Sequence, residues 1–277
     1  TADSVKLYLE ETFTFRNVPP GTYEIHARVQ NPGVRPPDTT GAPSLQELGI
    51  VRVDVTTTDL ENVVVALRPG ETVTGEIVFD GVPPPNFRAN LSVQSAPRRT
   101  SFGTARVSVE AQTFTARDLF GELLFRGSLS APGGSWWLKA VLLNGKDVTD
   151  VPTVFTSRDS GRLQVVFTSN APGLEGNVTD DDGKPAGGTQ VAIFGADEAS
   201  WVRFSSRMRR SNVTRDGKFV LRGLREGRYY VVAVPVNTIM LHSPDPGFLE
   251  ELKKVATEVV LNAGETRTLD LRVLRFD

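Results

Sequence analysis

One phrase is repeated along this chain. Residues 13–25 read FTFRNVPPGTYEI, and residues 219–231 read FVLRGLREGRYYV. A degraded middle copy has LLFRG at 123–127, a turn three residues longer, and GSWWL at 134–138. Repetition of a β-rich phrase predicts an array of similar modules. Such an array favours a scaffold over a catalyst.

Bulk composition excludes several classes of protein. The 277 residues include no cysteine, so the chain has no disulfide framework, thiolate metal site or cysteine nucleophile. The net charge of −2 gives no electrostatic attraction to nucleic acid or to an anionic membrane surface. No apolar run approaches the length of about 18 residues that a membrane-spanning helix needs. We therefore expect no nucleic-acid partner and no membrane insertion.

The last block of the chain, residues 173–277, has the pattern of a complete β-module. An alternating strand at 174–180 is followed by DDGKP, a turn sequence because Asp and Gly tolerate the backbone angles of tight turns. Short alternating segments with turn residues between them are typical of a β-sandwich. Further strands are expected at 190–194, 219–221, 229–234 and 268–273.

The other two blocks are defined by comparison with the last. The middle block, residues 71–172, begins with an alternating strand at 73–79 and ends with another at 163–167. Gly75 and Gly176 are 101 residues apart, which sets the repeat length. The first block, residues 1–70, contains only the second half of a module and ends with a strand at 63–67. The sequence thus predicts two complete sandwiches after one partial sandwich that lacks its first strands.

One short helix is predicted near residues 247–256. Phe248, Leu249, Leu252 and Val255 recur at helical spacing, with acids early and lysines late, as the helix dipole favours. We expect this helix to pack across one edge of the last sandwich.

The repeated residues resemble a known family. Gly176-x-Val178, a DGKP turn at 182–185, Gly217-x-Phe219 and Gly227-x-Tyr229 look like the carboxypeptidase regulatory-like domain. The resemblance implies an all-β chain of tandem prealbumin-like or Ig-like antiparallel sandwiches. It also implies a bacterial exported protein, extracellular or at the cell surface. That family is mostly non-catalytic and serves as spacer, stalk or adhesion module, so no functional residue carries over.

The search for catalytic patterns finds none. His26 and His242 lie in different blocks and in no metal-ligand spacing, and no nucleophile elbow, P-loop or dinucleotide fingerprint occurs. We expect no enzyme activity and no cofactor. The carboxylates of Asp180, Asp181 and Asp182 could hold calcium, but the loop lacks the distal Glu of a calcium loop, which favours a solvated turn.

Side-chain alternation places apolar residues on the outer faces of two strands. In the last block Tyr229, Val231 and Ala233 should face the core, which turns the three residues at 230, 232 and 234 outward. In the middle block Trp136, Leu138 and Ala140 should face inward, which turns Trp137 outward. An outward apolar stripe needs a cover. The cover is the chain's own loops and helix, a neighbouring module or partner protein, or a sugar stacked on Trp137 or Trp201.

The half module is the main functional clue. Phe13, Phe15, Tyr23 and Ile25 would lose their packing partners, at about 1.5–3 kcal/mol for each large apolar side chain left bare. Either the missing strands lie upstream of Thr1, or another subunit supplies them by strand addition. A head-to-tail contact that does not close grows into a filament.

We therefore expect a structural protein, a subunit of an extracellular fibre or surface assembly that self-associates through its sheet edges. The alternatives are a carbohydrate- or protein-binding spacer of a larger secreted or outer-membrane protein, and an accessory region of a peptidase. A cluster of arginines in the last block could meet an acidic partner surface or be a solvated face. The candidate interface residues are Phe13, Phe15, Trp137, Arg207, Arg209, Arg210, Tyr230, Val232 and Val234.

Overall fold

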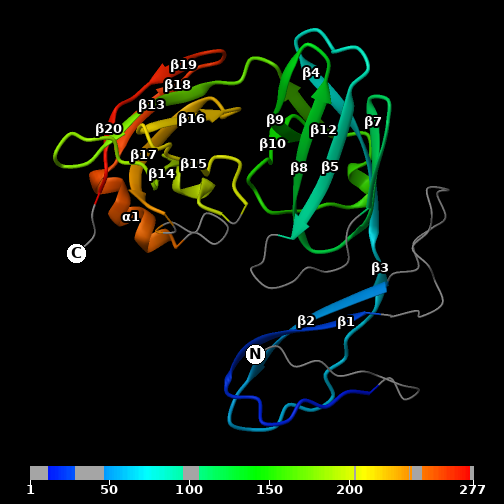
Figure 1. The fold of residues 1–277 in the computed structure, drawn as a ribbon. Coiled ribbons are helices and arrows are strands. Elements are labelled where there is room, and N and C mark those ends of the chain that lie inside the picture. Colours follow the sequence, from blue (N-terminus) through cyan, green and yellow to red (C-terminus); the bar gives the residue numbers. More distant parts are fainter. Residues whose placement is uncertain are drawn as a thin grey trace. The chain divides into compact units, whose positions relative to one another are not determined.

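The structure is a computed structural model that describes residues 12–28, 47–95, 106–202, 204–236, 238 and 245–274. The chain forms two compact units, Thr1–Gly70 and Glu71–Asp277, each described below by itself. Figure 1 shows that the described residues are mainly strands, with one α-helix. The predicted all-β class with a single short helix is confirmed. Within the described residues, no helix is long and apolar enough to cross a membrane.

The first unit contains one small antiparallel sheet in the order β1-β2-β3 (Figure 1). Its strands are β1 (Gly21–Arg28), β2 (Glu47–Val55) and the short β3 (Arg68–Pro69). The strand predicted at 63–67 is absent, and residues 12–16 form no strand either. A strand needs a partner for its backbone hydrogen bonds, and no described strand pairs with either segment.

Residues 71–172 form the first of two sandwich-like regions in the second unit. Strands β12 and β4 run parallel at its centre, and all other pairs are antiparallel. The order is β11-β8-β9-β12-β4-β7-β6, with β10 on β9 and β5 on β8. The strands are β4 (Glu71–Asp80), β5 (Arg88–Ser95), β6 (Arg106–Glu110), β7 (Thr113–Leu119), β8 (Glu122–Ala131), β9 (Gly134–Leu143), β10 (Lys146–Asp147), β11 (Thr153–Val154) and β12 (Leu163–Thr168), with a 3-10 turn η1 (Ser157–Asp159).

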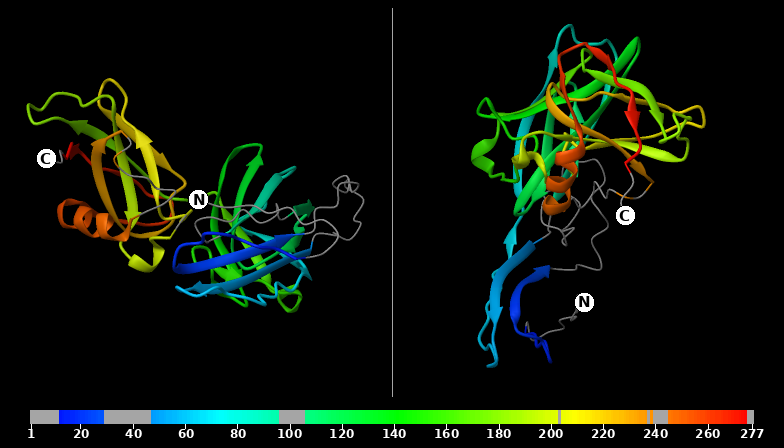
Figure 2. Two further views of the ribbon diagram at one scale, coloured as in Figure 1. Left: turned by 90° about the horizontal axis from the view of Figure 1, so that it is seen from below. Right: turned by 90° about the vertical axis from the view of Figure 1, so that its left-hand side faces the viewer.

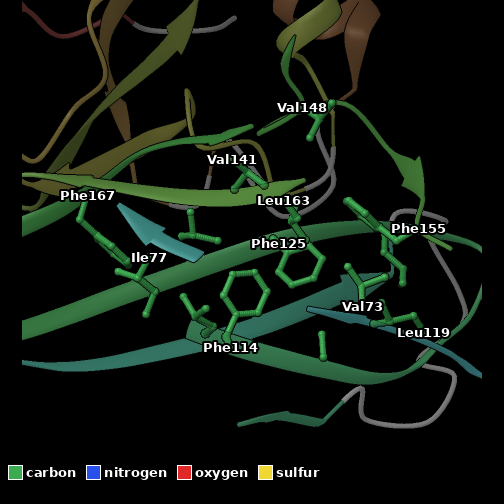
Figure 3. Packing of buried hydrophobic residues seen from close by; sticks show 14 of the residues in the cluster. Val73, Ile77, Phe114, Leu119, Phe125, Val141, Val148, Phe155, Leu163 and Phe167 are labelled. Atoms are coloured by element: carbon green, nitrogen blue, oxygen red, sulfur yellow. The ribbon is translucent and has the colours of Figure 1, made fainter. Parts of the chain in front are cut away.

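The core of this region is aromatic and well buried. Figure 3 shows Phe114 and Phe125 inside it, with ring centroids 5.8 Å apart. Phe125 also meets Phe155 edge-on at 4.9 Å, a favourable arrangement of aromatic rings. A Cβ on Gly75 would collide with Phe114 and with the Leu163 carbonyl. Gly75, the counterpart of Gly176, is therefore a site where neighbouring groups approach too closely for any side chain.

Strand β9 departs from the predicted alternation after Leu138. The pairing of β12 with β9 passes from Phe167–Leu138 to Val166–Ala140, so Lys139 is an extra residue that forms a bulge. The bulge shifts the inward face by one position, and Val141 rather than Ala140 joins the core. The prediction that Ala140 faces inward is wrong for this reason, whereas Trp136 and Leu138 pack in the core as predicted.

Residues 173–277 form two facing sheets and a helix. One sheet has the order β16-β13-β19 with β20 on β13, and the other β15-β14-β17-β18. The elements are β13 (Gly173–Thr179), β14 (Thr189–Gly195), η2 (Glu198–Ser200), β15 (Arg209–Asn212), β16 (Lys218–Arg222), β17 (Gly227–Pro235), α1 (Pro246–Val255), β18 (Thr257–Leu261), β19 (Thr266–Thr268) and β20 (Leu271–Arg272). This region has its own core, separate from that of residues 71–172. The division of the second unit into modules 71–172 and 173–277 stays a prediction.

Helix α1 packs on the face of a sheet and not across an edge as expected. Asp245 caps it by accepting from the Gly247 amide at 3.0 Å, and Pro246 occupies its first turn. Leu249 and Leu252 are fully buried in a cluster with outward residues of β14 and β17. Figure 2 shows the helix ribbon beside the strands of this region. The helix therefore supplies a second apolar layer on the far side of that sheet.

Candidate interaction surfaces

The sheet of the first unit has one apolar face that its own described residues do not bury. Tyr23 lies opposite Val53, and Ile25 lies opposite Val51, so these four side chains share a face. All four are only half-buried, and so is Ala27 on the same face. Among the described residues of this unit, Leu48 and Gly49 alone are buried. The face has the composition of a sandwich core without the burial of one.

The opposite face of the same sheet carries most of its polar side chains. Thr22 donates to Asp54 at 2.6 Å, and the His26 ring lies 3.2 Å from the Glu24 carboxylate. Partial burial of the His26 ring lowers its pKa below 6.5, which outweighs the opposite effect of Glu24. Ile50 and the buried Leu48 lie on this face too, so it is more polar than the first face but not purely polar.

Phe13 and Phe15 were predicted to lie at an interface. Both side chains are half-buried, and their ring centroids are 5.8 Å apart. The backbone around them carries no strand pairing. Their role in contact with another chain stays a prediction.

The outward stripe of the last region is covered by the chain itself. Val232 and Val234 are buried with Leu249 and Leu252 of α1, and Tyr230 packs against the same cluster. The predicted alternation is correct, because the residues at 229, 231 and 233 belong to the core on the other face of the sheet. The cover of this stripe is the chain's own helix α1. Val232 and Val234 are therefore inaccessible to a partner.

The two tryptophans considered for sugar stacking both have neighbours within the chain. Trp201 is buried and donates its indole N–H to the Gly195 carbonyl at 2.7 Å. It therefore offers no ring face to a sugar. Trp137, on β9, is half-buried against Gly223, where any Cβ would meet the indole ring. Gly223 also has φ +68°, a conformation that favours glycine.

A buried charge network joins residues 71–172 to residues 173–277. The Asp150 carboxylate accepts from the Ser206 amide at 2.6 Å and from the Ser206 hydroxyl at 2.7 Å. It also accepts from Arg126 at 3.0 Å, and the Arg225 guanidinium lies 3.5 Å away. Asp150 and both arginine side chains are at most 14% exposed. One carboxylate thus bridges a cation of its own region and three groups of the next.

The arginines of this network are also held by backbone carbonyls. Arg126 donates to the carbonyls of Phe125 and Thr149 at 2.8 and 2.7 Å, and to that of Phe204 at 3.0 Å. Burial lowers the pKa of the Arg126 guanidinium, and Asp150 opposes that effect. The fixed donor geometry of arginine suits such a site, where each N–H needs a partner.

Two further contacts strengthen the connection between residues 71–172 and residues 173–277, which we call the joint. Arg225 binds the carboxylate of Asp147, whose other oxygen accepts from the Thr149 amide at 2.9 Å. Burial raises the pKa of Asp147, but the bonds from Thr149 and Arg225 outweigh it and leave this pKa below 3.8. Lys139, the bulged residue of β9, lies 3.7 Å from Glu226 of the next region. The joint therefore combines a stacked indole with several ion pairs.

The arginine cluster of the last region divides into two environments. Arg207 lies over the Tyr229 ring at 5.7 Å and donates to the Glu226 carbonyl at 2.9 Å, so it is part of the fold. Arg209 and Arg210 are exposed on β15, an edge strand, where charge discourages the addition of another strand. Their contact with an acidic partner stays a prediction.

The acidic turn at 180–182 is organised by its own backbone. The Asp180 carboxylate accepts from the amides of Asp182 and Lys184 at 3.0 and 2.9 Å. Across the described part of the chain, no group of three or more His, Cys, Asp or Glu could hold a metal ion. His242 lies outside the described residues.

Comparisons with known proteins give distant structural matches. No family model matches the chain. No curated protein matches it either. Solved structures that align include the Bacillus anthracis TIE protein, at 10% identity and TM-score 0.25 over 95% of this chain. GBS52, the minor pilin of Streptococcus agalactiae, aligns at 12% identity and TM-score 0.25, over 73% of this chain and 95% of that one.

BcpA, the major pilin subunit of Bacillus cereus, aligns at 11% identity and TM-score 0.28, over 82% of this chain and 84% of that one. The chain spans 41% of the TIE protein. TM-scores this low assign no function. The resemblance to the carboxypeptidase regulatory-like domain has no matching family model and stays a prediction.

Proposed function

We propose that this chain is a non-catalytic structural subunit of an exported assembly, extracellular or at the cell surface. Neighbouring subunits join through the sheet of β1 and β2. The observation that carries the proposal is the apolar face of Tyr23, Ile25, Val51 and Val53, none of which is buried. Burying such a face against a neighbour would stabilise the complex by about 25 cal/mol for each Å² removed from water.

The edges of the last region support the choice of the first unit as the assembly surface. On β18, the outward carbonyl of Val260 accepts from the Arg267 side chain at 3.0 Å. On β15, at the other end of the same sheet, Arg209 and Arg210 are exposed. Both are devices that keep an edge strand from pairing with another chain.

The charge network around Asp150 supports a structural role of a second kind. A buried ion pair with every oxygen bonded fixes one arrangement of two surfaces, because any sliding leaves a charge without a partner. A subunit that transmits force along an assembly needs such fixed joints. Self-association into a homo-oligomer or filament remains the arrangement that we propose first.

Light scattering after size-exclusion chromatography, together with electron microscopy, tests the proposal. We expect the purified chain to form oligomers or filaments in proportion to its concentration. Val53→Lys places a charge on the apolar face and should disperse them, whereas Arg52→Gln, on the neighbouring residue of the polar face, should not. A monomer at every concentration would contradict the proposal and favour the spacer alternative.

A further inference from the structure

The first unit repeats the construction of β17 and β18. Tyr23 pairs with Val53, and Tyr229 pairs with Val259. Each residue of the second pair lies 206 positions after its counterpart in the first pair. The Tyr23 hydroxyl donates to the carbonyl four residues before it at 2.8 Å, and the Tyr229 hydroxyl does the same at 2.8 Å. Six residues before each tyrosine, Asn17 has φ 57° and Gly223 has φ 68°. Residues 13–67 therefore correspond to residues 219–273.

In the last region, β17 has a second neighbour that β1 lacks. Strand β14 pairs antiparallel with β17, with Ile193 opposite Val231 and Val191 opposite Ala233. In this closed sandwich Tyr229, Val231 and Ala233 pack against the facing sheet and are at most 1% exposed. Within the described residues β1 pairs with β2 alone, and the equivalent side chains are half-buried. The unfilled edge of β1 is the place that β14 fills in the last region.

A second missing strand corresponds to β13. Strand β13 pairs antiparallel with β16 and parallel with β19 and β20. The first unit's equivalents of β16 and β20 are residues 13–15 and 65–66. Neither segment forms a strand. Loss of one shared partner explains both failures, because β13 lies between the two segments that it organises.

We propose that the open face of the first unit binds a two-strand segment from outside residues 1–277 that has the pattern of residues 173–195. One strand would run antiparallel to β1, with branched apolar side chains opposite Ile25 and Ala27. The other would pair with residues 13–15. The inference rests on the proposed function, since it names the partner chemistry of the same assembly surface.

Charge complementarity predicts which side chains that segment carries on its outward face. In the last region Phe194 lies opposite Tyr230, and both pack in the apolar cluster beneath α1. The residue of β1 equivalent to Tyr230 is Glu24, on the polar face. The strand that joins β1 should therefore carry polar side chains outward, with a cation opposite Glu24.

A second copy of this chain cannot supply the segment without opening its own sandwich. The matching apolar residues of β13 and β14 are fully buried, with Leu174, Val178, Val191 and Ile193 at 0% exposure. Two edges of the last region are also protected, β18 by Arg267 and β15 by the charges of Arg209 and Arg210. A second copy of residues 1–277 is therefore not the source of this segment, and self-association of the pure chain would pack one apolar face against another without adding strands.

The test uses the full chain and a synthetic peptide of residues 173–195 with Phe194→Lys. Fluorescence anisotropy measures binding, and hydrogen exchange read by mass spectrometry locates it. We expect saturable binding with slower exchange in residues 13–28 and no change in β17. A peptide that also carries Ile193→Asp is the matched control and should not bind. Glu24→Lys in the chain should weaken binding of the Phe194→Lys peptide roughly twofold to fivefold, and a Phe194→Glu peptide should restore it.

The outcomes separate this inference from the proposed function. Self-association without peptide binding overturns the partner chemistry and leaves the proposed function standing. Peptide binding by a chain that never self-associates supports the partner chemistry and overturns the homo-filament. Binding unaffected by Ile193→Asp, exchange protection only in β17, or β1 amides already protected in the free chain would each overturn the inference.

Discussion

The Asp150 carboxylate lies 3.0 Å from the Arg126 guanidinium, in a site where both side chains are largely shielded from water. Both residues belong to the same region of the second unit, yet Asp150 makes its shortest bonds to Ser206 of the next. The ion pair therefore holds a carboxylate in place for a contact with the following sandwich. The two regions are held in a fixed arrangement because the other bonds of the Asp150 carboxylate come from Ser206 and Arg225 of the next region.

Removing the Asp150 carboxylate should destabilise the second unit strongly. Asp150→Ala leaves Arg126 and Arg225 buried without their shared acceptor, and breaking a buried pair in this way costs about 3–5 kcal/mol. We expect the free energy of unfolding to fall by this amount, and the urea concentration at the unfolding midpoint to fall with it. Tryptophan fluorescence is a suitable probe because Trp136, Trp137 and Trp201 all belong to this unit.

Asp182→Ala provides the matched control for that experiment. Asp182 lies in an exposed turn and pairs with Lys184 only at 3.5 Å. Exposed pairs contribute about 0–1 kcal/mol, so this variant should unfold almost like the unmodified chain. Equal effects of the two substitutions would show that the joint contributes no more than a surface ion pair.

Acid should weaken the joint through Asp147. Its folded-state pKa is depressed below 3.8, so its contribution to stability is fully present above that value and is lost as pH falls through the folded pKa. We expect the free energy of unfolding to decline below about pH 4. Asp147→Asn should lower stability at neutral pH and flatten this part of the profile.

The measurement for Asp147 is a series of urea titrations from neutral to acid pH. The quantity compared is the difference between the unmodified chain and Asp147→Asn at each pH. This difference should shrink toward zero as the carboxyl becomes protonated. A difference that stays constant through the acid range would mean that the Asp147 charge plays no part in stability.

Gly223 should tolerate no side chain, for two separable reasons. Its φ of +68° costs a non-glycine residue about 1–2 kcal/mol, and a Cβ would also meet the Trp137 indole. Gly223→Ala should therefore lower the urea midpoint and change the emission of Trp137. In a Trp137→Ala background the clash disappears, so Gly223→Ala should cost less there. Equal costs in both backgrounds would rule out the packing contribution.

The strands, the helix and the inward or outward direction of side chains were predictable where the local sequence pattern decides them. Residues 229–234 alternate so regularly that their core face followed from Tyr229, Val231 and Ala233 alone. Helix α1 has both its cap and its apolar spacing in the sequence. Its position does not follow from either, because an apolar stripe on the helix fits an edge or a face equally well.

The joint was not predictable, because its members meet only through tertiary structure. Asp150, Ser206 and Arg225 are separated by 19 residues or more. An arginine or aspartate in a β-rich sequence is more often solvated than buried. Of the joint, only Trp137 had a signal, an outward indole in an alternating strand. The bulge at Lys139 was also invisible, since its position depends on the register of β12.

A matched pair of tyrosines distinguishes a closed sandwich from an open one. Tyr229→Phe removes a buried hydroxyl that donates to the Arg225 carbonyl at 2.8 Å and accepts from Arg207 at 3.2 Å. Loss of such a buried hydrogen bond should lower the free energy of unfolding by about 0.5–1.5 kcal/mol. The high end of that range applies where the backbone carbonyl is left unpaired. Tyr23→Phe removes the same bond to Pro19 in the first unit, where the side chain is half-exposed and water replaces the lost partner.

We therefore expect the first substitution to lower the thermal midpoint of the second unit and the second to leave the first unit's transition nearly unchanged. Differential scanning calorimetry can follow both transitions in one chain. The cost at Tyr23 should rise toward that at Tyr229 when the peptide of residues 173–195 covers the open face. Two equal costs in the free chain would mean that the first unit is already sealed and that its apolar face needs no partner.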